Sequence, residues 1–171
     1  MDERVMGTIL NQERVDNFYD KLSRKIDSWD ENVVRYRHKY PLLRKLPVEQ
    51  AIRLVKVAPA VLHLLISLVN HEEISDRTKR IVGGAVAYFI VPIDLIPEGV
   101  VGPVGYVDDV LVGLVLIDRL LNGDDEQEKA IIADLWRGTE EELNALRALV
   151  QIADVIRHLE KYLKKTFPRW F

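Results

Sequence analysis

The residues best suited to chemistry in this sequence are four carboxylates in an otherwise apolar stretch, residues 87–109: Asp94, Glu98, Asp108 and Asp109. The same stretch holds three of the chain's 7 prolines and three of its 9 glycines, so neither a continuous helix nor a regular strand can run through it. A carboxylate in apolar surroundings needs a helix cap, a counter-charge or a metal ion. The sequence therefore predicts a kinked, acidic corner that joins two apolar helices.

Three hypotheses for this corner stay open. In the first, Asp94 and Asp108 cap helices, and Asp109 favours the positive end of a helix dipole. In the second, Asp94, Asp108 and Asp109, with Glu98 as a further ligand, converge on Mg²⁺, Mn²⁺ or Ca²⁺, which prefer hard oxygen ligands. In the third, paired carboxylates perform acid–base hydrolysis, although no nucleophile or positioned histidine stands at a matching spacing. We favour the caps and assign no catalytic residue and no cofactor.

Composition narrows the class of protein. The chain has 171 residues, which suits one domain with a substantial core, and it contains no cysteine, which excludes disulfides, thiolate metal sites and a cysteine nucleophile. Its 24 basic and 27 acidic residues leave a net charge of −3, so no long-range field attracts nucleic acid. The first residues show no secretory signal pattern. We therefore expect a cytoplasmic protein that does not bind nucleic acid.

Two uncharged runs, residues 57–69 and 81–93, raise the question of a membrane. Each is shorter than the roughly twenty apolar residues that a spanning helix needs, so we expect a soluble domain, with a re-entrant or peripheral membrane protein as the alternative. The C-terminus is basic and aromatic, and it either contacts an anionic membrane surface or packs onto the domain. The residues concerned are Lys161, Lys164, Lys165, Phe167, Arg169, Trp170 and Phe171.

Apolar residues recur at alternating spacings of four and three along residues 15–40. This stripe consists of Val15, Tyr19, Leu22, Ile26, Trp29, Val33, Tyr36 and Tyr40. The spacing predicts one long helix that either lies along the bundle, which we favour, or forms a dimerisation arm. Ser28 and Glu31 have the spacing of a capping box and would mark a break, but the unbroken stripe favours continuity.

Five further helical segments follow. The second, residues 48–70, is apolar on almost every face after Ala58, so we expect it in the core, kinked or restarted at Pro59. We expect His63 to be a hydrogen-bonded core histidine rather than a metal ligand. Caps at Ser75 or Asp76 predict a third helix over residues 77–91. Asp108 or Asp109 is expected to start a fourth, residues 110–121.

The remaining two segments complete the predicted bundle. Asp124 is expected to cap a fifth segment that ends near Trp136, and Thr139 to cap a sixth whose apolar spacing runs to Leu163. We predict an all-α, single-domain bundle of five or six helices around a central helical hairpin with a Pro/Gly-rich acidic corner. Its parts are residues 1–47 (long N-terminal helix and connection), 48–122 (core) and 123–171 (C-terminal helices).

Residues 52–121 resemble the YkvA-like family of uncharacterised bacterial and archaeal domains. The matching residues at the corner are Tyr88, Pro92, Asp94, Leu95, Ile96, Pro97, Gly105, Asp108 and Asp109. The family usually places Asp directly after the second proline, where this chain has Glu98. The resemblance implies a helical hairpin and no established activity.

On function, we predict a helical interaction or scaffold module that binds a protein partner or a second copy of itself, oligomeric or adjacent to a membrane surface. The competing class is an enzyme that uses Mg²⁺, Mn²⁺ or Ca²⁺ at Asp94, Asp108 and Asp109.

Overall fold

The computed structural model describes residues 12–24, 30–36, 38, 44, 46–90 and 106–150. These residues contain no strand, and the predicted all-α fold is confirmed. The helices are α2 (Gln12–Ser23), α3 (Asp30–Tyr36), α5 (Val48–Asn70), α6 (Asp76–Ile90), α8 (Tyr106–Leu121), α9 (Glu126–Leu135) and α10 (Glu140–Val150).

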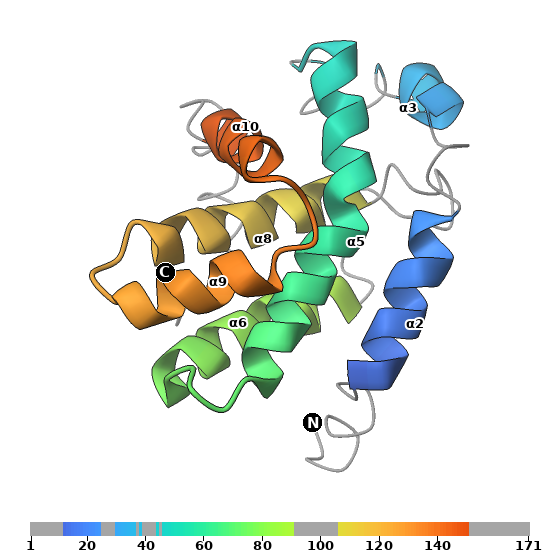
Figure 1. The fold of residues 1–171 in the computed structure, drawn as a ribbon. Coiled ribbons are helices and arrows are strands. Elements are labelled where there is room, and N and C mark those ends of the chain that lie inside the picture. The colour runs from blue at the N-terminus through green and yellow to red at the C-terminus, as the bar shows by residue number, and fades with distance from the viewer. Residues whose placement is uncertain are drawn as a thin grey trace.

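Helix α5 is the centre of the bundle. It contacts α2 and α3 on one side and α6, α8 and α9 on the other, and α10 packs on α8 (Figure 1). Leu54, Leu64, Leu65 and Leu68 of α5 are fully buried, because an apolar helix lowers its free energy by covering every face. The core therefore forms around α5 and the α6–α8 pair, as the sequence predicts.

The bounds of α5 agree with the predicted residues 48–70. Pro47 stands directly before the helix, where its fixed φ and missing N–H are tolerated, and Pro59 lies inside it. Of the two alternatives for Pro59, a kink or a restart, the restart does not occur. The helix continues through the proline because its flanks are buried by the surrounding helices.

By length and composition, α5 is the one helix in the described part of the chain that could cross a membrane. Of its apolar 18-residue window, 67% is buried inside the bundle. A core helix of a soluble protein passes the same test of length and hydropathy, so the finding fits a membrane span or a buried core helix. Solubility therefore stays a prediction.

The prediction of one long N-terminal helix is wrong. Helix α2 ends at Ser23 and α3 begins at Asp30, and residues 25–29 lie outside the described part. Figure 1 shows the two helices beside different halves of α5, with α3 near its N-terminal end. One residue of the apolar stripe in each helix contacts the core, since Tyr19 of α2 packs against it and Val33 of α3 is buried. Two short helices can each follow the surface of α5, whereas one straight helix would leave it.

The starts of the next two helices are set by different features. The Thr78 backbone N–H donates to Ser75 Oγ over 3.2 Å, which confirms the predicted cap of α6. Helix α8 already includes Tyr106, ahead of the predicted start at Asp108 or Asp109. Those two aspartates are therefore first-turn residues of α8, and not the residue that precedes the helix.

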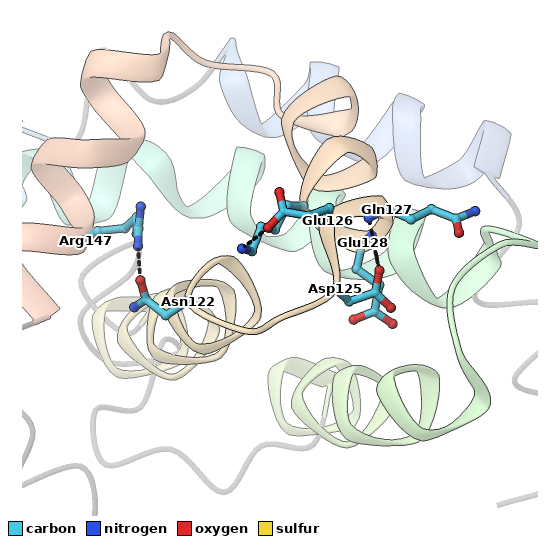
Figure 2. A network of polar contacts seen from close by, with 7 residues as sticks. Asn122, Asp125, Glu126, Gln127, Glu128 and Arg147 are labelled. Carbon is cyan, nitrogen blue, oxygen red and sulfur yellow. Dashed lines mark hydrogen bonds and ion pairs between the residues drawn. The ribbon is translucent and has the colours of Figure 1, made fainter.

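The predicted N-cap of α9 is wrong by one residue, because two adjacent aspartates, Asp124 and Asp125, precede the helix. Asp125 is its N-cap, and its Oδ1 accepts the N–H groups of Gln127 and Glu128, both over 3.0 Å (Figure 2). The predicted cap, Asp124, stands one residue too early. Thr139 does cap α10, since its Oγ1 accepts the Glu142 N–H over 3.0 Å. The predicted continuation of this helix to residue 163 lies outside the described residues.

Candidate functional site

The predicted acidic corner falls mostly outside the described residues. Pro92, Asp94, Pro97, Glu98 and Gly105 are among the undescribed positions. For the other corner residues, Tyr88, Asp108 and Asp109, the structure describes the helical backbone and not the side chain.

The structure does describe the two helices that the corner connects. Helices α6 and α8, which precede and follow it, contact each other and α5. Asp108 and Asp109 lie in the first turn of α8, where the positive end of the helix dipole stabilises a negative charge. The capping hypothesis for Asp94 and the metal and hydrolytic hypotheses for the corner side chains stay predictions. Among the side chains that the structure describes, no group of three or more His, Asp or Glu could hold a metal ion.

The described residues form a polar cluster around the buried His63, which we call the Asp16 cluster: Asp16 and Tyr19 of α2, His63 of α5, and the partly exposed Arg137 after α9. The Oδ1 atom of Asp16 lies 2.8 Å from Nε2 of His63. Because a carboxylate oxygen only accepts, the His63 ring carries its proton on Nε2. Arg137 Nη2 donates to the same oxygen over 2.7 Å. Asp16 therefore connects α2 with two other parts of the chain at once.

Aromatic contacts complete the cluster. The Tyr19 and His63 rings lie edge to face, with 5.5 Å between their centroids and 64° between their planes. The Arg137 guanidinium carbon lies 4.9 Å from the centroid of the Tyr19 ring, within the range of a cation–π interaction. Each of the four side chains thus contacts at least two of the others.

The protonation of His63 is set by its surroundings. The residue is 4% exposed, and its burial lowers the pKa of the ring below the ordinary 6.5. The hydrogen bond to Asp16 raises this pKa and the positive charge of Arg137 lowers it, and burial is the largest effect. His63 is therefore a neutral, hydrogen-bonded core histidine at neutral pH, and that prediction is confirmed.

Sequence reasoning missed the partners of His63. Asp16, Tyr19 and Asp20 are spaced by three and four residues, which places them on one face of a helix and could have indicated a polar face beside the stripe. Arg137 is 121 residues from Asp16, and no local spacing relates them.

A second polar contact joins α9 to the start of α6. Thr78 Oγ1 donates to Glu128 Oε2 over 3.2 Å, and the Ser75 N–H donates more weakly to Oε1 over 3.4 Å. Ser75 Oγ also donates to Thr78 Oγ1 over 3.0 Å. Glu128 and Thr78 are 8% and 6% exposed, so each buried group satisfies the other. Figure 2 shows Glu128 next to the cap residue Asp125.

A third contact joins α10 to the end of α8. Arg147 Nε donates to Asp118 Oδ1 over 2.8 Å. Arg147 Nη2 donates to Asn122 Oδ1 over 2.9 Å, as Figure 2 shows. Asn122 Nδ2 in turn donates to Asp118 Oδ2 over 3.0 Å. A fourth contact is the ion pair between Lys56 of α5 and Asp30 of α3, 3.0 Å long. The described polar side chains thus repeatedly connect one helix to another.

An open cleft of 870 Å³ lies between the first turns of α5 and helix α10. Its described lining is Gln50, Arg53, Thr139, Glu141, Glu142, Ala145, Leu146 and Ala148. This lining mixes charges of both signs with small apolar side chains and includes no histidine.

The central segment of the chain is similar to one described family. Residues 78–115, which include most of α6 and the first part of α8, match a family described as "Protein of unknown function (DUF1232)". This is an uncharacterised helical family, and the match is compatible with the YkvA-like resemblance.

A curated relative is similar to about half of the chain. "Uncharacterized protein ORF9" from Methanothermobacter thermautotrophicus is 29% identical over 84 residues, which cover 49% of this chain and 56% of that protein. The chain thus spans little more than half the length of this relative. No solved structure matches. The matched proteins have no described activity.

Proposed function

We propose that the chain is a helical interaction or scaffold module, built on a YkvA-like core. The observation that supports the proposal is that the described polar side chains form hydrogen bonds and ion pairs between helices. Asp16, Glu128 and Arg147 each bond to a different helix or segment, so the described polar chemistry fixes how helices are arranged. The family and the relative that match are uncharacterised and indicate no specific role.

We further propose that the N-terminal helices supply the surface that binds a partner, and that this partner is a second copy of the chain. Val34 of α3 is 54% exposed and stands next to the buried Val33. The ion pairs that attach α3 and α2, Lys56–Asp30 and Arg137–Asp16, involve partly exposed side chains. Such pairs contribute little to stability, so contacts with a partner can replace them.

Light scattering across a concentration series of the full chain tests this proposal. We expect a dimer that Val34→Glu dissociates, because the substitution places a charge on the exposed apolar position. Arg35→Gln is the matched control, since Arg35 is exposed on the same helix and its replacement changes the net charge by the same amount. A wild-type chain that stays monomeric at every concentration would refute self-association.

A membrane-adjacent role is the second candidate, and one observation favours it. Helix α5 has the length and hydropathy of a membrane span, although most of its apolar window is buried in the bundle. A cytoplasmic location, with or without contact to a membrane surface, and the absence of nucleic-acid binding are part of the proposal.

A further inference from the structure

The geometry points to a ligand site in the cleft between α5 and α10, which binds a short basic peptide that has a free carboxyl terminus. This inference goes beyond the proposed function, because none of the described lining residues belongs to α2 or α3. Figure 1 shows α3 and α10 on opposite sides of the N-terminal half of α5. A peptide in the cleft therefore leaves the surface around Val34 free for a second copy of the chain.

The first step is that charges of opposite sign line the cleft without pairing. Helix α5 contributes the guanidinium of Arg53, and helix α10 contributes the carboxylates of Glu141 and Glu142. All three residues are exposed, and none of them forms an ion pair with a residue that the structure describes. A ligand that carries both signs of charge can pair with both helices, whereas an ion of one sign can pair with only one of them.

The second step is the number of charges, which decides between classes of ligand. Two carboxylates and one guanidinium give the described lining a charge of −1, so a ligand with two cations and one anion is the best match. A basic peptide has this set in its α-ammonium, its side-chain ammonium and its terminal carboxylate. A polyamine lacks the anion that Arg53 can bind, and a phosphate group would be repelled by the two carboxylates.

The third step is the size of the cleft and its apolar part. Its volume of 870 Å³ lies in the range of about 300–1,000 Å³ that is typical of small-molecule sites, which favours a peptide over a single amino acid. Ala145 and Ala148 follow Glu141 at spacings of four and three residues, so the three lie on one face of α10. Small side chains beside a carboxylate leave room for a peptide backbone.

Gln50 adds an unused hydrogen-bond acceptor to the same cleft. It precedes Arg53 by three residues, so both lie on one face of α5. Its Oε1 atom is buried and accepts no hydrogen bond from a residue that the structure describes. A buried acceptor without a donor costs free energy, and an N–H group of a bound peptide removes this cost when the amide turns toward the cleft.

Isothermal titration calorimetry on the full chain tests the inference with the tripeptide lysyl-alanyl-alanine and with its C-terminal amide. We expect the free-carboxyl peptide to bind about three- to tenfold more tightly than the amide, because the amide has no anion for Arg53. Arg53→Gln should bind the peptide and the amide equally. Glu141→Gln should weaken the binding of both by the same factor, since it removes a partner of the ammonium groups. Added salt should weaken binding to the wild type.

The matched controls are Arg35→Gln and Glu140→Gln. Both residues are exposed, neither is among the described lining residues, and each substitution changes the net charge by the same amount as its test variant. Both controls should bind the peptide as the wild type does, and so should Val34→Glu, which tests self-association and not this cleft.

Three results would overturn the inference. The first is a wild type that does not bind the free-carboxyl peptide at millimolar concentration or that binds the amide equally well. The second is an Arg53→Gln variant that still distinguishes the peptide from the amide. The third is a loss of affinity in Glu140→Gln as large as that in Glu141→Gln, because the peptide would then respond to overall charge and not to the cleft.

Discussion

The contact between Glu128 and Thr78 permits a sharp test of how the bundle is held together. We predict that Glu128→Ala destabilises the protein mainly because it leaves the Thr78 hydroxyl without its acceptor. Thr78 is 6% exposed, so water cannot easily replace the carboxylate. Ser75 is exposed, and its backbone N–H lies 3.4 Å from Glu128, so a water molecule can replace this weak hydrogen bond at little cost in free energy.

The magnitude follows from these contacts. A hydrogen bond to a charged acceptor contributes about 1.5–3 kcal/mol, and the loss of partly buried methylene groups adds to this. We expect Glu128→Ala to lower the free energy of unfolding by about 2–4 kcal/mol. For a chain of this length the melting temperature would fall by roughly 4–16 °C. Glu126→Ala is the control on the same helix, since its side chain is 83% exposed and its loss should cost under about 0.5 kcal/mol.

Thermal and urea unfolding of a double-mutant cycle would decide the mechanism. Thr78→Val removes the hydroxyl that Glu128→Ala leaves unpaired, so the double variant should cost less than the sum of the singles by about 1 kcal/mol or more. Additive costs would show that the Thr78–Glu128 bond contributes nothing of its own, and the reasoning would then be wrong.

Three further predictions concern the cap, the acidic corner and the membrane. Asp125→Ala should lower the free energy of unfolding by about 1 kcal/mol, and Asp124→Ala by less than half of that, because of the two aspartates it is Asp125 that accepts N–H groups of α9. Urea unfolding measures both losses, and equal losses would contradict the assignment of Asp125 as the cap. Melting curves recorded with Mn²⁺ and with a chelator should coincide, since we favour structural roles for the corner carboxylates. If Mn²⁺ raises the melting temperature, and if Asp94→Asn and Asp108→Asn abolish that rise, the corner is a metal site instead. Fractionated cells should release the protein without detergent, and membrane recovery that resists alkaline carbonate would identify α5 as a span.

The elements that sequence predicted well have their determinants close by in the chain. Helix α5 follows Pro47 and is apolar on almost every face in its second half, so both its bounds and its burial could be predicted. Ser75 and Thr139 precede their helices at the spacing that capping requires, and both accept the expected N–H group. In each case the information lies within four residues of the feature.

The elements that sequence missed depend on distant contacts. The stripe of residues 15–40 identifies which face is buried, but spacing alone does not tell whether the backbone continues between two buried turns, and here α2 and α3 are separate helices. Asp124 and Asp125 have equal capacity to cap α9. Glu128, the third residue after Asp125, bonds to Thr78 of α6, which fixes where the helix begins. The corner side chains themselves, such as Asp94, stay predicted.

The separation in sequence between Asp16 and Arg137, which form an ion pair, has a consequence for biosynthesis. The partners are 121 residues apart. At about 5–20 residues per second, a ribosome makes Asp16 roughly 6–24 s before Arg137. Helix α2 is thus among the first described elements to emerge and among the last to reach its complete set of contacts. During that interval Tyr19 and the apolar face of α2 must be shielded by α5, by a chaperone or by the ribosome surface, and a nascent chain arrested before residue 137 should expose α2 to protease.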